Sequence, residues 1–335
     1  MIKKVIMYIF LVCIGLSACN GNAIISIEKD ERTKVPYTRI RLPMGYIPSV
    51  QFAPFYVAIE KGYYKQEGIE VSFDYSFETD AVTLVGHQNI PFAVVSAEQV
   101  LLARAQDLPV VYVMNYYKDY PVSIVAKKKS GIKEIESLKG KKIGIPILAG
   151  ASYIGLRALL NAANMQENEV NLEVIGYNQV ESLMFDRQDA VVCYTNNEPI
   201  QLRAQGEEIE EIKVADHAML ISNGIITNEE MILKNPDLVR RMVRATLRGM
   251  RTALDDPKDT YEICKIYVEN LSKLNPKQEK IQKEILRTTM DLWKADTLGT
   301  SDPEAWKNMN RLLLEMGLLT KKGNIEKAYT NDYIQ

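Results

Sequence analysis

Short runs of β-branched and aromatic residues alternate with helical runs from Tyr37 to about residue 228. Helices are expected between the strand-like runs, for example at 152–163 and 179–186. Such alternation predicts an α/β fold with mostly parallel sheets. The runs that predict strands are 38–42, 69–75, 91–95, 108–117, 120–127, 141–146, 172–177, 189–194 and 211–215.

One early segment, QFAPFYVAIEKGYYKQEGIEV at 51–71, predicts a helix and then a strand. Pro54 suits a first helical turn, and Phe55 shares a face with two aliphatic residues at helical spacing. Gly62 and Gly68 supply turns before a strand that begins at Ile69. Tyr56 lies off the apolar face, so we expect it to form part of a binding wall.

After Asn228 the chain reads as almost wholly helical. The clearest amphipathic run, NPDLVRRMVRATLRGMRTALDD, lies at 235–256. This last third is expected to pack as helices around a domain that is already built.

Two segments resemble crossings between lobes, near residues 120–127 and 222–227. We therefore expect the chain to leave one lobe, build a second and return. Lobe 1 is predicted at 37–122, lobe 2 at 123–222 and the return to lobe 1 at 223–335. Ligands of open α/β sheets gather at the carboxyl ends of strands, which would face the cleft between the lobes.

The N-terminus reads as an export signal. MIKK is followed by an apolar run at 5–16 that ends in LSAC. The apolar run is shorter than the roughly 20 residues of a spanning helix. An uncleaved membrane anchor is the alternative. The segment resembles a bacterial lipoprotein signal, which implies removal of residues 1–18, acylation of Cys19, a flexible tether at 19–36, and a protein held on the outer face of the cell membrane. Stable attachment needs two or more acyl chains.

Composition excludes several function classes. The 335 residues are 47% hydrophobic and carry a formal net charge of −2, which gives no basis for binding nucleic acid. Cys193 and Cys264 are expected to be buried free thiols, with a disulfide as the alternative. His87 and His217 have no ligand partners at useful spacing, so we expect no metal and no cofactor.

Four stretches together carry a resemblance to a known family. They are GYIPSVQFAPFYVAIEKGYYKQEGIEV, the run from PFAVVSAEQ to KKIGIP, DAVVCYTNNEPIQL, and GIITNEEMILKNPDLVRRMVRATLRGMRTALDDP. In order and spacing the chain resembles the NMT1/THI5-like solute-binding proteins, which include pyrimidine-, riboflavin-, sulfonate- and nitrate-type members. Members often carry Trp where this chain has Tyr46.

This resemblance implies a type II periplasmic-binding-protein fold, with two α/β lobes, a hinge, a ligand cleft and a helical C-terminal third. It also implies a non-enzymatic receptor that delivers a small molecule to the permease and ATPase subunits of an ABC importer.

The first group of candidate ligand-binding residues lies in lobe 1. Tyr46 and Gln51 follow the first strand, and Tyr56 lies on the next helix. Ser96 ends a strand and is expected mainly to cap the following helix. Asn115 and either Tyr116 or Tyr117 lie where the first crossing meets the cleft, and strand alternation predicts that one tyrosine faces in.

The second group lies in lobe 2. Ser152 is a candidate helix N-cap, and Tyr153 follows in the first turn. Tyr194 ends a strand, and Asn197 and Glu198 come before a helix opened by Pro199. Amides and a carboxylate offer the donors and acceptors that the edge of a polar ring requires, although capping is an alternative role for this triplet.

The leading functional hypothesis is a receptor for a thiamine-type pyrimidine precursor, hydroxymethylpyrimidine or formylaminopyrimidine. A flavin such as riboflavin is the alternative. A sulfonate or nitrate receptor is weaker, because Lys118 is the one cation in the candidate cleft motifs. A pyrimidine synthase that uses its own histidine and iron is disfavoured, since such relatives carry a cysteine cluster that this chain lacks.

Overall fold

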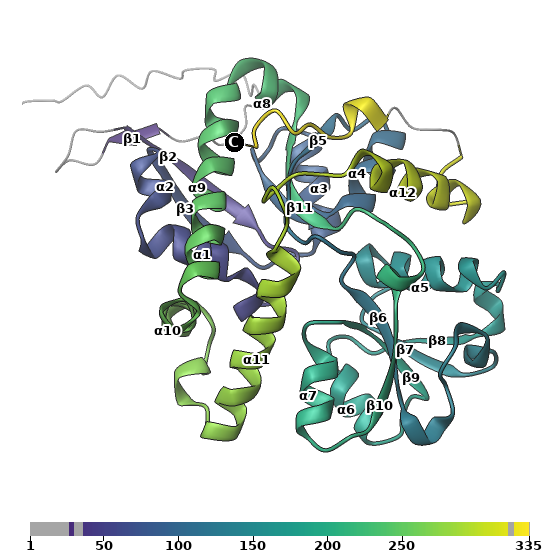
Figure 1. Ribbon diagram of the computed structural model, residues 1–335. Coiled ribbons are helices and arrows are strands. Elements are labelled where there is room, and N and C mark those ends of the chain that lie inside the picture. Colours follow the sequence, from purple (N-terminus) through teal and green to yellow (C-terminus); the bar gives the residue numbers. More distant parts are fainter. Residues whose placement is uncertain (1–26, 30–35, 321–324, 335) are drawn as a thin grey trace, which may run out of the picture.

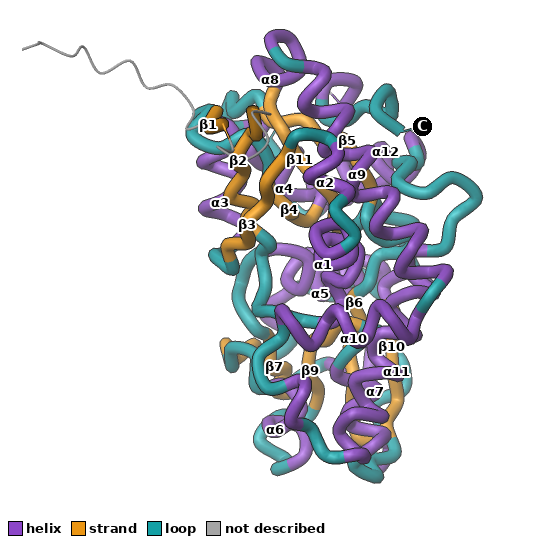
Figure 2. The backbone as a smooth tube through the Cα atoms, turned by 90° about the vertical axis from the view of Figure 1, so that its left-hand side faces the viewer, coloured by secondary structure: helices purple, strands orange, loops and turns teal. Residues whose placement is uncertain are grey.

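The computed structural model describes residues 27–29, 36–320 and 325–334. Its strands fall into two groups, one around β2–β5 and β11 and one around β6–β10, and helices cover both (Figure 1). The two groups lie at opposite ends of the molecule in the perpendicular view (Figure 2). This is the expected α/β architecture of two lobes.

The first group consists of two three-stranded sheets. One has the order β1-β2-β3, and β1 pairs antiparallel with β2 whereas β2 pairs parallel with β3. The other has the order β4-β11-β5, and both of its pairs are antiparallel. The strands are β1 Ile27–Lys29, β2 Pro36–Pro43, β3 Ile69–Asp74, β4 Ala93–Ser96, β5 Val110–Asn115 and β11 Asn223–Asn228.

The second group is one five-stranded sheet of order β10-β6-β9-β7-β8. β7 pairs parallel with both of its neighbours, whereas β6 pairs antiparallel with β9 and β10. Its strands are β6 Val122–Lys127, β7 Lys142–Ile145, β8 Asn171–Val174, β9 Ala190–Tyr194 and β10 Ile209–Lys213.

The expectation of mostly parallel sheets was wrong. Both crossings between the groups enter as antiparallel strands: β6 carries the chain out, and β11 brings it back between β4 and β5. A strand that arrives from the opposite lobe runs against strands built by local strand–helix–strand units. Hydrophobic patterning reports burial and does not report strand direction.

The helices confirm the expected helical C-terminal third, since β11 is the last long strand and α8 to α12 follow it. The helices are α1 Ala53–Glu60, α2 Tyr63–Gln66, α3 Glu78–Gly86, α4 Ala97–Ala105, α5 Gly150–Ala162, α6 Gln179–Met184, α7 Glu198–Ala204, α8 Glu229–Lys234, α9 Pro236–Asp255, α10 Pro257–Tyr267, α11 Pro276–Trp293 and α12 Pro303–Glu315.

The predicted start and end of the first helix are confirmed. Pro54 lies in the first turn of α1, and Gly62 and Gly68 both adopt positive φ values, 71° and 65°, before β3. Only glycine adopts this left-handed conformation without a steric cost, so the two turns follow from the sequence.

Helix α9 packs closely on α1. At Gly249 of α9 an added Cβ would lie 2.1 Å from the carbonyl oxygen of Pro54 and 2.9 Å from the Cβ of Ala58. The buried hydroxyls of Tyr64 and Thr246 also meet at 2.7 Å. The return helix is therefore held on the first lobe by close backbone approach as well as by apolar burial.

The C-terminal segment adds to the sheet that contains β5. Tyr329 bridges in parallel to Tyr112, whose backbone N–H donates to Ala328 and whose carbonyl accepts from Thr330. The Tyr329 ring stacks on Trp306 of α12 at 5.0 Å. The sequence pattern did not indicate this pairing.

The signal peptide expected at 1–18 and the lipidation expected at Cys19 fall outside the described residues. Within the tether expected at 19–36, residues Ile27–Lys29 form β1 and Pro36 begins β2. In the part of the chain that the structure describes, no helix has the length and apolar character needed to cross a membrane. The lobe boundaries at 122 and 222 stay predictions.

Cys193 and Cys264 are both buried and unpaired, as expected. Cys193 lies in β9 and Cys264 in α10, so the two thiols belong to different parts of the core.

We expect Gly249→Ala to destabilise the protein. Overpacking against a backbone carbonyl costs about 1–3 kcal/mol, which outweighs the gain of about 1 kcal/mol in helix propensity. Urea unfolding measures the change. Asp255→Ala, an exposed position on the same helix, is the control and should stay within about 0.5 kcal/mol of the original protein. A Gly249→Ala protein as stable as the original would contradict the close contact between α1 and α9.

Candidate functional site

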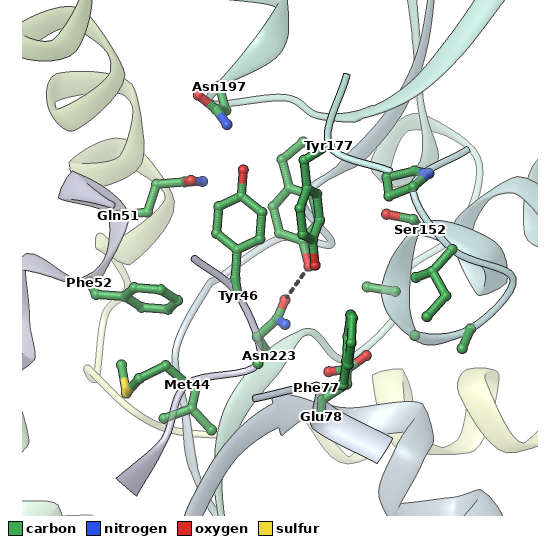
Figure 3. A pocket seen from close by; sticks show the side chains of 18 of the residues that line it. Met44, Tyr46, Gln51, Phe52, Phe77, Glu78, Ser152, Tyr177, Asn197 and Asn223 are labelled. Atoms are coloured by element: carbon green, nitrogen blue, oxygen red, sulfur yellow. Dashed lines mark hydrogen bonds between the residues drawn. The ribbon is translucent and has the colours of Figure 1, made fainter. Parts of the chain in front are cut away.

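A hollow of about 940 Å³, counting its open mouth, lies between the two groups of strands (Figure 3). It collects the residues that follow β2, β5, β7 and β8, the carboxyl end of β9 and the starts of α3, α5 and α7. The lining consists of Met44–Tyr46, Gln51, Phe52, Phe77–Thr79, Val94, Tyr116, Tyr117, Pro146, Ile147, Ala149–Ser152, Tyr177, Gln179, Tyr194, Asn197, Glu198 and Asn223.

Seven of the eleven predicted ligand-binding residues line this hollow. These seven therefore lie together at one hollow, and their contact with a ligand stays a prediction. They are Tyr46, Gln51, Tyr117, Ser152, Tyr194, Asn197 and Glu198.

Glu198 and Asn197 form a fixed polar group at the start of α7. Glu198 Oε2 accepts from the Tyr194 backbone N–H at 3.0 Å, and Oε1 accepts from Asn197 Nδ2 at 2.8 Å. Gln201 Nε2 in turn donates to Asn197 Oδ1 at 2.9 Å. Asn197 holds the N-cap position without a side-chain capping bond, because its amide is used on these two neighbours.

Burial raises the pKa of Glu198 to about 7, and the hydrogen bonds from its own loop oppose this shift. Each carboxylate oxygen has two lone pairs, so the carboxylate can accept a further hydrogen bond beside those from Tyr194 and Asn197. Glu198 can therefore accept hydrogen bonds from ligand N–H groups while it is ionised. With a pKa of about 7, it becomes protonated as the pH falls below neutral.

Aromatic rings from both groups of strands face the hollow. Tyr46 and Tyr177 meet across it edge to face, with centroids 4.9 Å apart and planes at 88° (Figure 3). The Tyr194 hydroxyl lies 3.4 Å from Asn223 Oδ1, which connects β9 with the start of β11. Such rings present π faces to a flat ligand.

Tyr116 and Tyr117 both line the hollow, so the expectation that only one faces in was wrong. β5 ends at Asn115, and strand alternation does not apply to residues that follow a strand. The Tyr116 hydroxyl donates to the carbonyl of Gln51 at 2.7 Å, and its ring stacks on Phe55.

Tyr56 is not part of this site, which corrects its assignment to a binding wall. It is fully buried, stacks on Tyr267 at 4.5 Å and bonds to the Tyr75 hydroxyl at 3.2 Å. Tyr56 lies off the main apolar stripe of α1, and it packs against a second layer of aromatic residues from β3 and α10. A helix in a large protein can be buried on more than one side.

Asn115 also lies away from the hollow and joins the two crossing segments. Its Oδ1 accepts from the Tyr112 hydroxyl at 2.8 Å, and its Nδ2 donates to the Tyr117 carbonyl at 2.9 Å. Ser222 Oγ donates to the same carbonyl at 2.8 Å. The Tyr117 carbonyl therefore accepts hydrogen bonds from both the outgoing and the returning chain.

Tyr153 points along α5 instead of into the hollow. Its hydroxyl donates to Glu167 at 2.6 Å and accepts from Arg157 at 2.8 Å. Ser152 does line the hollow, but α5 begins at Gly150 with Ala149 as N-cap, so the expected capping role of Ser152 was wrong.

Ser96 has a different role from the helix cap that the sequence predicted. It precedes α4 without a side-chain capping bond. Its backbone N–H and its hydroxyl both donate to the Glu78 carboxylate, at 2.8 Å for each of the shortest contacts. Ser96 thus positions a lining residue and is absent from the lining itself.

Neither Glu78 nor Glu98 is among the residues that the sequence analysis predicts for the site. Glu98 is fully buried, and burial, followed by the neighbouring Glu78 charge, raises its pKa to about 8. Its Oε1 has no hydrogen-bond partner, and its Oε2 lies 3.4 Å from the Tyr120 hydroxyl. An acid in a first helical turn usually serves the helix dipole, so the sequence could not mark either residue.

The mouth of the hollow is apolar and was also missed. Phe77, Ile147 and Tyr177 are exposed by 54%, 36% and 40%, and they come from three separate loops. Isolated exposed apolar residues are common in any sequence, so only the fold reveals that these three gather.

The charge of the lining is one-sided. Of the described residues that line the hollow, Glu78 and Glu198 are ionisable carboxyls, and none is Lys, Arg or His. Over the described ranges, no three His, Cys, Asp or Glu side chains gather as a metal site would need.

Comparison with known proteins agrees with this geometry. A family model described as NMT1/THI5 like matches residues 49–260. The riboflavin-binding protein RibY of Chloroflexus aurantiacus is 36% identical over 88% of this chain and 86% of its own length. A formylaminopyrimidine-binding protein of Halalkalibacterium halodurans is 25% identical over 91% of both.

An enzyme also appears among the relatives. A 4-amino-5-hydroxymethyl-2-methylpyrimidine phosphate synthase of Legionella pneumophila is 22% identical over 89% of this chain and 92% of its own length. Among solved structures, the periplasmic aliphatic sulphonate binding protein SsuA of Escherichia coli superposes with a TM-score of 0.70 at 12% identity, over 89% of this chain and 94% of that one. This likeness confirms the periplasmic-binding-protein fold.

The buried acid Glu98 makes stability depend on pH. Because its folded pKa is raised from 4.5 to about 8, the folded state binds more protons than the unfolded state between these values, and stability falls as pH rises through that window. Glu98→Gln has no proton to lose. Relative to the original protein it should gain stability between pH 5 and pH 8.5, on the order of a few kcal/mol.

Urea unfolding at both pH values measures this difference. The exposed Glu136→Gln removes the same charge and should follow the original protein. Parallel pH profiles for Glu98→Gln and the original protein would show that Glu98 is ionised throughout.

Proposed function

This chain belongs to the NMT1/THI5-like family of substrate-binding proteins, and from that membership and its pocket we propose that it binds a flat, uncharged nitrogen heterocycle for an ABC importer. One observation carries the proposal. The hollow combines five tyrosines from four segments of the chain with amides and carboxylates, and its described lining has no cationic side chain. Rings can cover the faces of a flat guest while the polar groups meet its edge.

A flavin ring is the first candidate ligand, which reverses the order expected from the sequence. The relative that is 36% identical is named for riboflavin. The pocket also changes character along its length, from Glu198 and Asn197 inside to Phe77 and Ile147 at the mouth. An isoalloxazine ring has the matching pattern, with one edge of carbonyl and N–H groups and one methylated apolar edge.

A thiamine-type aminopyrimidine is the second candidate. It is supported by the relative named for formylaminopyrimidine and by the carboxyl of Glu198, which can accept from a ring amine. A sulfonate or nitrate ligand is disfavoured, because an anion would meet two carboxyls and no cation of the described lining.

A synthase activity is the remaining alternative, motivated by the relative that is 22% identical. Such an activity would need a histidine at the ligand. The chain has two histidines, His87 and His217, and neither belongs to the lining. We therefore propose a receptor without turnover.

Delivery to an importer needs a protein outside the cytoplasm. We propose that Cys19 is acylated after removal of residues 1–18 and that the chain then serves permease and ATPase subunits. Lobes with boundaries at 122 and 222 would open and close around the ligand, as hinged binding proteins do.

Binding energetics favour closure of the two lobes on the ligand. An aromatic contact adds about 0.5–1.5 kcal/mol beyond burial, whereas micromolar affinity corresponds to about 8 kcal/mol. Burial and hydrogen bonds from both sides must supply the difference. Gln51 and Asn223 on one side and Asn197 and Glu198 on the other offer such bonds.

The ligand proposal is tested by titration of purified protein. Riboflavin fluorescence should be quenched on binding, because the ring stacks on tyrosine, with a Kd of about 1 μM or below. Calorimetry with hydroxymethylpyrimidine, formylaminopyrimidine and taurine completes the set. Binding of formylaminopyrimidine alone would favour the second candidate, and binding of taurine alone would contradict the proposal.

Glu198→Gln separates the two ring types. It replaces an acceptor by an amide that keeps one acceptor, so we expect an aminopyrimidine to lose about tenfold or more in affinity. A flavin, which offers both donors and acceptors, should lose less. Calorimetry measures both, with Glu136→Gln as the charge-matched control at an exposed residue outside the lining. Unchanged affinity for every ligand that binds would remove Glu198 from the site.

A further inference from the structure

We propose that Glu78 is a specificity-determining residue, which rejects anionic ligands by occupying the first turn of α5 from across the hollow. The inference rests on the proposed function for the identity of the ligand. It concerns whether the pocket accepts the neutral ligand or its anionic phosphate ester. Glu78 begins α3 on one side, whereas α5 belongs to the five-stranded sheet on the other side. Both line the same hollow (Figure 3).

The Glu78 carboxylate is held by donors from both sides. Ser96 donates through its backbone N–H to Oε2 at 2.8 Å and through its hydroxyl to Oε1 at 2.8 Å. The backbone of Ala151, in the first turn of α5, forms a further hydrogen bond with the carboxylate. The side chain therefore reaches from the start of α3 to the amino terminus of α5.

Gly150 makes this approach possible. A Cβ at residue 150 would lie 2.0 Å from Glu78 Oε1, and its φ of +65° also favours glycine. The absence of a side chain at residue 150 leaves the space that the carboxylate fills. This contact accounts for the glycine in the loop between β7 and α5.

The hydrogen bonds favour Glu78 as the member of the Glu78 and Glu98 pair that carries the negative charge. Its oxygens accept the three hydrogen bonds described above, which favours the ionised form, although burial raises its pKa. Glu98 has an unpartnered oxygen and holds the proton. The Tyr120 hydroxyl lies 3.1 Å from the Ala151 carbonyl, so a protonated Glu98 can donate to Tyr120 while Tyr120 donates to α5.

A carboxylate at this point changes what the pocket can bind. The amino terminus of a helix after a strand attracts phosphate or sulfonate groups. Here its N–H groups already face a negative charge, so a second anion would meet repulsion in a partly buried site. A ligand that ends in hydroxyl or N–H groups would gain an acceptor instead.

The test compares each neutral ligand with its phosphate ester. Riboflavin is paired with flavin mononucleotide, and 4-amino-5-hydroxymethyl-2-methylpyrimidine with its phosphate. The original protein should prefer the neutral member by about 100-fold or more, and Glu78→Gln should reduce this preference by about tenfold or more. Glu136→Gln is the charge-matched control and should keep the original preference.

Several outcomes overturn the proposal. Equal binding of both members by the original protein would contradict it without any variant. An unchanged preference in folded Glu78→Gln, or in Glu78→Ala if the glutamine variant does not fold, would also contradict it.

A ligand-independent measurement separates this proposal from the proposed function. If neither neutral member binds, the proposed ligand class fails, and a thermal shift with inorganic phosphate then tests Glu78 directly. Millimolar phosphate should stabilise Glu78→Gln and leave the original protein unchanged. Equal responses of the two proteins would remove the anion-rejecting role.

Discussion

The insertion of β11 between β4 and β5 is the constraint on which the rest of the structure depends. It returns the chain from the five-stranded sheet and brings Asn223 to the hollow. At Gly224 an added Cβ would lie 2.2 Å from the Tyr112 hydroxyl, so the strand fits only without a side chain there. That hydroxyl lies 2.8 Å from the Asn223 carbonyl and from Asn115 Oδ1. One buried phenol therefore ties both crossing segments together.

The carboxyl groups that line the hollow are hydrogen-bonded to neighbouring donors of the protein. Asn197 and the Tyr194 backbone hold the carboxyl of Glu198, and Ser96 holds that of Glu78. Unpaired buried polar groups are costly, so these donors fix the carboxyl groups before any ligand arrives. Preorganised acceptors of this kind favour recognition of N–H and O–H groups and disfavour anions.

Burial of carboxyl groups also gives the site its sensitivity to protons. Glu198 and Glu98 have pKa values of about 7 and about 8 because burial penalises the charged form. Perturbed acids of this kind concentrate at functional sites. Glu98 lies outside the lining of the hollow and contacts the Tyr120 hydroxyl at the first crossing segment. The same hydroxyl contacts the carbonyl of Ala151, which lines the hollow.

The sequence by itself determined the α/β order of elements, the helical last third and four of the residues that line the hollow from the second group of strands, Ser152, Tyr194, Asn197 and Glu198. Turn glycines, a proline after a polar triplet and apolar periodicity are local signals, and they predicted the end of β9 at Tyr194 and the start of α7 after Asn197. Tertiary structure decided strand direction, the burial of Tyr56 behind α1 and the meeting of Glu78 with Gly150. These depend on contacts between residues far apart in the chain, which neither periodicity nor the chemistry of a single residue encodes.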